Sequence, residues 1–122
     1  MVRDVVTVTK DATIRETIKI MYKKHIGSVM ITDKEKCKGI FTNTDALRVI
    51  VKNIPLDSEV EKAMSKNVLT VHEKDSFSKA KELMRRYRVR HLPVVDTKGF
   101  IVGILTLRSL FDEISGLKKS KE

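Results

Sequence analysis

The pattern of hydrophobic and polar positions along this chain occurs twice. Three features return at one constant separation: Val5–Val8 as Val68–Val71, Met21 as Met84, and Asp33 as Asp96. The series Gly39-Ile40-x-Thr42 returns one residue farther on, as Gly103-Ile104-x-Thr106. Self-similarity at a fixed separation indicates a supersecondary unit that is present in two copies.

The first copy predicts a short strand, a helix, two strands and a second helix. Thr13 and Glu16 have the spacing of a capping box, which begins a helix, and Gly27 marks the exit from that helix. Apolar runs predict strands at 28–31 and 39–41 around a polar turn at 33–36. The helix expected over 43–52 has little polar face, so it must be covered on two sides.

The second copy repeats this order after a linking segment. Ser58 is expected to cap a short helix that ends near Met64, and a strand over 68–71 follows. Asp75 or Ser76 caps the next helix, strands at 92–95 and 100–105 surround a turn, and a last helix covers 107–114. The fold class is therefore α+β (α/β), with residues 1–54 and 55–117 as the two repeats and 118–122 as a frayed basic tail.

The net charge of +9 introduces nucleic acid as an alternative partner. Part of the excess lies in one stripe at Arg85, Arg86, Arg88 and Arg90, and part in the tail. Only 5% of residues are aromatic and Trp is absent, so a surface for stacking single-stranded bases is not evident. Solvated helix faces explain the same charges, and so does a field that attracts a phosphorylated ligand.

The sequence does not support assignment of the chain to the enzymes or to the membrane proteins. No apolar run approaches the ~18 residues of a membrane span, and the first residues lack the apolar core of a signal peptide, so we expect a cytoplasmic protein. The single Cys37 rules out an internal disulfide, and the His, Cys and acidic residues show no metal-ligand spacing. No Walker loop or activated nucleophile is present. We therefore expect neither an enzyme nor a bound cofactor.

The best candidate site is Gly39–Asp45, where a buried strand runs directly into a helix. Thr42 stands at the expected N-cap and Asp45 at the third helical position, which resembles a capping box. A helix N-terminus also offers unpaired N–H groups and a positive dipole to an anion. The local pattern alone leaves both interpretations open: a helix cap or a ligand site.

From about Val2 to Ile114 the two copies resemble a tandem pair of CBS domains, also called a Bateman module. The resemblance rests on Thr-Val, Met, Asp and Gly-Ile-x-Thr recurring in register in both copies. It implies β-α-β-β-α repeats whose sheets pack around a pseudo-two-fold axis and leave two clefts. It also implies an adenosine-containing ligand, such as AMP, ADP, ATP or S-adenosylmethionine, and regulation of an attached or associated enzyme or transporter.

The resemblance also assigns site residues. Asp45 would accept hydrogen bonds from the ribose hydroxyls, and Thr42 would lie near the ribose and phosphate. The remaining positions divide into phosphate contacts at Arg90, His91 and Arg108 and apolar neighbours of the base at Ile40, Val68, Leu69 and Pro93. In the second cleft the equivalents are Ser109 for the carboxylate and Gly27, Ser28 and Thr44 for the cations. One strong, composite site is therefore expected.

We thus expect a regulatory nucleotide-binding module that forms a homodimer through helices 43–52 and 107–114. Two alternatives remain open. The first is a ligand-independent module for dimerisation or protein interaction, and the second is a nucleic-acid binder that uses Arg85–Arg90.

Overall fold

The computed structural model describes residues 5–66 and 68–108, and these form two compact units. One unit comprises Val6–Val68, and the other takes in Val5 and the described chain from Leu69 onward. The two sequence repeats meet near residue 55, but the first unit extends beyond that point. It does so because the segment that follows the first repeat folds back onto it.

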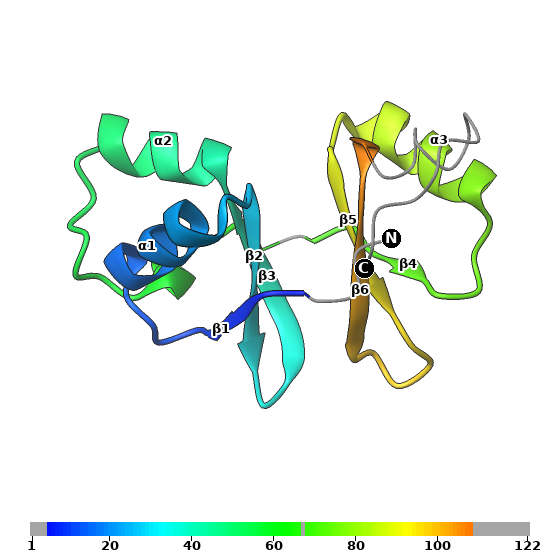
Figure 1. Cartoon of the computed structure of the whole chain (residues 1–122), viewed down its shortest axis with the longest axis horizontal. Helices are drawn as coiled ribbons and strands as arrows, with labels where there is room; N and C mark the ends of the chain where they lie inside the picture. The colour runs from blue at the N-terminus through cyan, green and yellow to red at the C-terminus, as the bar shows by residue number, and fades with distance from the viewer. Residues whose placement is uncertain (1–4, 67, 109–122) are drawn as a thin grey trace. The chain divides into compact units, whose positions relative to one another are not determined.

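The first unit has the order β-α-β-β-α, as the sequence predicts (Figure 1). Its elements are β1 (Thr7–Thr9), α1 (Ile14–Lys24), β2 (Ser28–Asp33), β3 (Lys36–Thr42) and α2 (Asn43–Val51). Strand β1 pairs in parallel with β2, and β2 pairs antiparallel with β3. The hairpin between β2 and β3 turns at Lys34 and Glu35, which both have positive φ. This turn is tighter than the four-residue turn expected from the sequence, so β3 begins earlier.

The second unit repeats this topology. Its elements are β4 (Val71–His72), α3 (Phe77–Tyr87), β5 (His91–Val95) and β6 (Ile101–Thr106). The pairing of the two hairpins shifts register at equivalent places, between Ile31 and Thr32 and between Val94 and Val95. This shared irregularity confirms that both units are copies of one α+β motif. Of the helix expected over 107–114, only Leu107 and Arg108 lie within the described residues.

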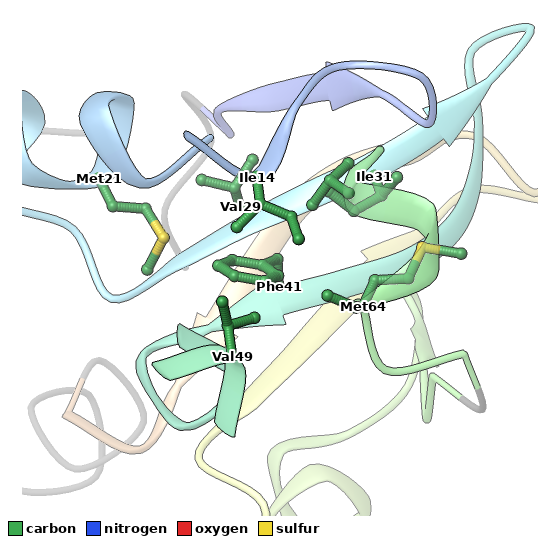
Figure 2. Close-up of a cluster of buried hydrophobic side chains, with 9 residues drawn as sticks. Ile14, Met21, Val29, Ile31, Phe41, Val49 and Met64 are labelled. Atoms are coloured by element: carbon green, nitrogen blue, oxygen red, sulfur yellow. The ribbon is translucent and has the colours of Figure 1, made fainter. Parts of the chain in front are cut away.

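One face of the first sheet packs on both helices. Figure 2 shows Phe41 of β3 in the middle of this cluster, between Ile14 of α1 and Val49 of α2. Phe41 and Ile14 are fully buried, and Val49 is 1% exposed. Removal of such large apolar side chains from water supplies the main driving force for folding. Among the described residues of the second unit, buried apolar side chains cluster around Met84, Leu92 and Leu105.

Two of the predicted elements differ from the structure. The linking segment forms a 3₁₀ helix, η1 (Val60–Lys62), whose N-cap Glu59 makes no side-chain capping bond, so the predicted Ser58 cap is wrong. Here the backbone is bound by tertiary contacts, since Val60 N donates to Ala12 O at 2.7 Å. The strand predicted over 68–71 is also shorter, because only Val71 and His72 pair with β5.

Helix α2 has an uncovered apolar face. Leu47, Ile50 and Val51 are 63%, 66% and 77% exposed. Only Asp45 and Val49 of this helix are buried. The sheet therefore covers one of the two sides of α2 that the sequence predicts to be covered. No helix within residues 5–66 and 68–108 is long and apolar enough to cross a membrane.

Candidate functional site

The predicted capping box at the start of α2 is present. Thr42 has extended backbone geometry, and its hydroxyl accepts from Asp45 N at 3.4 Å, while Thr42 N donates to Asp45 Oδ2 at 2.8 Å. Helix α1 begins with the same reciprocal bonds between Thr13 and Glu16. Strand β3 thus ends with Thr42 in an extended conformation directly before the first turn of α2. There the Thr42 side chain accepts a hydrogen bond from the Asp45 N–H group, which would otherwise be unpaired.

Asp45 differs from Glu16 because its carboxylate is buried. Asp45 is only 3% exposed, whereas Glu16 is exposed. A buried carboxylate needs hydrogen-bonding or charged partners, because loss of hydration otherwise disfavours the ionised form. Asp45 Oδ1 has two such partners beyond the cap: Arg48 Nη2 at 2.5 Å and Ser65 Oγ at 3.0 Å. The cap of α2 is therefore part of a larger polar network.

The sequence interpretation did not include Arg48 or Ser65. Arg48 lies three positions after Asp45 on the same helix, a spacing at which side chains meet, so a local signal existed. The same Arg48 nitrogen also donates to Ala63 O at 2.8 Å. Ser65 is twenty residues from Asp45 and has no local signal. Only the return of the linking segment to the sheet brings it there.

Strand β3 holds that segment along its outer edge. Ile40 N donates to Ser65 O at 3.0 Å, and Ser65 N donates to Ile40 O at 2.8 Å. Beside this bridge, a Cβ on Gly39 would stand 2.6 Å from both Met64 Sδ and Ser65 O. Only glycine permits this close approach, so Gly39 contributes to the site by placing Ser65 next to Asp45.

The three predicted phosphate contacts lie together at one end of the second sheet. His91 pairs with Thr106 in the β5–β6 register, and Leu107 N donates to Arg90 O at 2.9 Å. Arg90 is therefore bound through its backbone to the residue before Arg108, and both arginines are exposed. The end of the ladder thus brings the backbone of two arginines and one histidine close together.

His91 differs electrostatically from the two arginines. It is half-buried, and burial lowers its pKa below the ordinary value of 6.5, with a further lowering from the positive charge of Arg90. The imidazole is therefore neutral at pH 7. At that pH it offers a neutral hydrogen-bonding group, and Arg90 and Arg108 supply the charge.

The same backbone positions in the first unit lack these charges. Ser28 pairs with Thr42, and Asn43 N donates to Gly27 O at 3.1 Å, as Leu107 N does to Arg90 O. The counterpart of Arg108 is the exposed Thr44. Ser109, the counterpart of Asp45, lies outside the described residues. The uneven division of charge read from the sequence thus falls on structurally equivalent positions.

The apolar residues predicted to border a base occupy two kinds of position. Ile40 and Pro93 belong to β3 and β5 and are buried. Val68 and Leu69 are half-buried and precede β4. Of these four residues, Ile40 lies next to the Asp45 network, because its backbone forms a bridge with Ser65.

The basic stripe lies on and after α3. Arg85 and Arg86 have side chains that are 74% and 61% exposed, and both pair with Glu82. This ion pairing lowers the pKa of Glu82 and offsets part of the positive charge. Arg88 and Arg90 are exposed as well. The stripe fits a solvated helix face, and nucleic-acid binding stays a prediction.

No three His, Cys, Asp or Glu side chains come together as a potential metal site in the part of the chain that the structure describes. Cys37 is half-buried, and burial raises the pKa of its thiol. A raised pKa makes the nucleophilic thiolate scarce at neutral pH.

Comparison with known proteins agrees with the repeat structure. The sequence profile of the CBS domain matches twice, over residues 1–52 and 58–116. Among solved structures, the CBS domain protein PAE2072 from Pyrobaculum aerophilum, complexed with AMP, is similar with a TM-score of 0.84 and 26% identity. The alignment covers 95% of both chains. The CBS domain pair of protein MJ0100, in complex with 5′-methylthioadenosine and S-adenosylmethionine, has a TM-score of 0.83 and 29% identity over 93% of both chains.

Curated relatives are mostly longer than this chain. Inosine-5′-monophosphate dehydrogenase of Aquifex aeolicus is 37% identical over 90% of the chain, yet this region makes up only 22% of that protein. Across the first four curated relatives the chain spans 22% to 65% of their length. Relatives named as enzymes thus contain a similar region as a minor part.

Proposed function

Because the chain belongs to the CBS domain family, with one copy of the domain in each repeat, we propose that it is a regulatory module that binds an adenosine-containing nucleotide. The observation that carries this proposal is the Asp45 carboxylate, which is buried at a helix N-terminus next to the Gly39-Ile40 strand. A helix cap alone does not require burial, as Glu16 of α1 demonstrates.

Two similar structures support the ligand class. One is a complex with AMP, and the other contains 5′-methylthioadenosine and S-adenosylmethionine. These compounds share an adenosine moiety with a vicinal diol on the ribose, and they differ in the group attached at C5′. A carboxylate can recognise the shared diol, because each carboxylate oxygen can accept a hydrogen bond from one ribose hydroxyl.

We assign the ribose to Asp45 and Thr42 and the phosphate to Arg90 and Arg108. Arginine presents several N–H donors in a planar fork, which suits phosphate oxygens, and it stays charged at any physiological pH. His91 adds a neutral hydrogen-bonding group beside them. An anionic C5′ group such as a phosphate is favoured over the cationic sulfonium of S-adenosylmethionine by these charges. Ile40, Val68, Leu69 and Pro93 form the apolar side of the site for the base.

A regulatory role further requires that the ligand binds two arrangements of the protein with unequal affinity. We propose that the responding contact is an isologous homodimer in which the exposed α2 face of Leu47, Ile50 and Val51 is covered. The regulated activity would belong to an attached or associated enzyme or transporter. Consistent with this, the similar region of the Aquifex dehydrogenase is a minor part of an enzyme.

Calorimetric titration with AMP, ADP, ATP and S-adenosylmethionine tests the proposal. We expect at least one to bind, with AMP, ADP and ATP tighter than S-adenosylmethionine. Asp45→Asn keeps the shape of the side chain but removes its charge, and charged hydrogen bonds contribute about 1.5–3 kcal/mol each. Its Kd should therefore rise at least about tenfold. The control is Asp57→Asn, which makes the same charge change at a side chain that is 83% exposed.

The proposal fails if none of the four compounds binds, or if Asp45→Asn and Asp57→Asn bind as well as the wild-type chain does. The nucleic-acid alternative makes a different prediction. It requires affinity for DNA or RNA that falls steeply with salt and weakens when Arg85 and Arg86 are replaced by Gln.

A further inference from the structure

The hydrogen-bond acceptors of Asp45 are already occupied. An ionised carboxylate has about four lone-pair sites on its two oxygens. Within the described residues four donors reach them: Thr42 N at 2.8 Å and Thr42 Oγ1 at 3.2 Å on Oδ2, with Arg48 Nη2 at 2.5 Å and Ser65 Oγ at 3.0 Å on Oδ1. A diol can therefore bind to Asp45 only when it replaces donors that belong to the protein.

The four donors divide into two kinds. The Thr42 amide is part of the helix cap, and Arg48 is fixed by a second bond to Ala63 O at 2.8 Å. Displacement of either would break other contacts. The Thr42 hydroxyl also belongs to the cap, because it accepts from Asp45 N at 3.4 Å. Among the four donors, the Ser65 hydroxyl is the one that can turn away from the carboxylate by side-chain rotation and leave the cap and the Arg48 bonds in place. Replacement of the Ser65 hydroxyl therefore provides a place on Oδ1 for one hydroxyl of a vicinal diol.

Ser65 is also accessible to solvent. Ser65 belongs to the exposed residues, although Asp45, whose carboxylate it contacts, is only 3% exposed. Its backbone is bound to Ile40 through two hydrogen bonds of 3.0 Å and 2.8 Å. The side chain can therefore rotate while the backbone stays in place, and this rotation uncovers Oδ1.

We infer that the Ser65 hydroxyl occupies the place of a ligand hydroxyl on Asp45 Oδ1 and competes with the ligand for it. This inference rests on the proposed function and adds a specificity-determining residue to that site. Without ligand, Ser65 satisfies a buried carboxylate that would otherwise lack one donor. When a diol binds, one hydroxyl hydrogen bond replaces another of the same type, so the net gain at Oδ1 is small. Ser65 thereby lowers the affinity of the site for ribose compounds.

The test compares AMP binding by wild type, Ser65→Ala and Ser65→Thr in calorimetric titrations. Loss of the competing hydroxyl should lower the Kd for AMP about fivefold in Ser65→Ala, the effect of one typical hydrogen bond. Ser65→Thr keeps the hydroxyl and should bind AMP as the wild type does. Ser78→Ala removes an exposed serine from α3 and should change nothing.

A second ligand separates competition from a general loosening of the site. The monophosphate of 2′,3′-dideoxyadenosine keeps the base and phosphate but has no hydroxyl to place on Asp45. Ser65→Ala should leave its Kd within about twofold of the wild-type value, since no exchange at Oδ1 takes place. The gain for AMP alone would support the inference.

Three results would overturn it. An AMP affinity that is unchanged or weaker in Ser65→Ala would refute competition while leaving the proposed function intact. An equal gain for both ligands would indicate loosening instead of hydroxyl exchange. If neither the wild type nor Ser65→Ala binds AMP, the inference is overturned. The proposed function is overturned as well only if ADP, ATP and S-adenosylmethionine also fail to bind. Binding by Ser65→Ala alone would support both, with a stronger competitor than the fivefold expected.

Discussion

Replacement of Gly39 by Ala should destabilise the first unit. The added Cβ would lie 2.6 Å from Ser65 O and must retreat to the 3.4 Å at which ordinary contact begins. Met64 Sδ, also at 2.6 Å, is the flexible end of a side chain, but Ser65 O is backbone and is bound to Ile40 N. Separation of the two segments weakens both bonds of the Ile40–Ser65 bridge, at about 0.5–1.5 kcal/mol each, and disturbs the packing of Met64 at about 1–3 kcal/mol. We expect a net loss of about 3 kcal/mol in the free energy of unfolding.

Urea denaturation followed by circular dichroism measures this loss. Lys38→Ala changes an exposed neighbour on the same strand and should stay within about 0.5 kcal/mol of wild type. Met64→Ala relieves one of the two close contacts, so Gly39→Ala should cost less in that background yet retain the part due to Ser65 O. A cost below about 1 kcal/mol for Gly39→Ala in the wild-type background would show that the segment yields freely, and the reasoning from close approach would be refuted.

Three further predictions follow from the caps, the imidazole and the exposed helix face. Thr13→Ala and Thr42→Ala should each lower the free energy of unfolding by about 1 kcal/mol, because each removes an N-cap. Only Thr42→Ala should also weaken AMP binding. If both variants change the AMP affinity equally, Thr42 acts only as a helix cap. The folded-state pKa of His91 lies below 6.5, so as the pH falls from about 7 toward that lowered value the unfolded chain binds more protons than the folded chain does. The free energy of unfolding should therefore decline in this pH range, and denaturation at several pH values should show a flatter decline for His91→Gln. A decline identical to that of the wild type would exclude this histidine as its source. Ile50→Lys, at a side chain that projects to solvent, should leave the free energy of unfolding within about 0.5 kcal/mol yet abolish the proposed dimer in sedimentation velocity, and a wild-type chain that sediments as a monomer would contradict the dimer.

Local signals predicted the elements best. The Thr13-x-x-Glu16 and Thr42-x-x-Asp45 spacings identified two helix starts, and both capping boxes are present. Asp75 and Ser76 were equal candidates for the third start. Ser76 is the N-cap, while Asp75 accepts from His72 N in the preceding turn. Such features depend on neighbours within a few residues, so the sequence displays them directly.

Features that depend on tertiary contacts were not visible in the sequence. Ser58 has the spacing of a cap, yet its carbonyl accepts from Ile14 N, and the following residues are bound to the segment before α1. The roles of Glu16 and Asp45 look alike in sequence. Only the return of Ser65 to the edge of β3 distinguishes the buried carboxylate from the exposed one. The ligand contacts themselves stay predictions, since they rest on the resemblance of the two repeats to CBS domains.

The position of Cys37 provides a built-in reporter of local opening. It is the single cysteine of the chain, lies on β3 two residues before Gly39, and donates from Sγ to Gly39 O at 3.6 Å. Its thiol is half-buried and has a raised pKa, so a thiol-specific reagent should react slowly while the hairpin is closed. The labelling rate of the unmodified sequence therefore measures how often this edge of the sheet opens. A nucleotide that tightens the Asp45 network should slow that reaction, without any engineered probe.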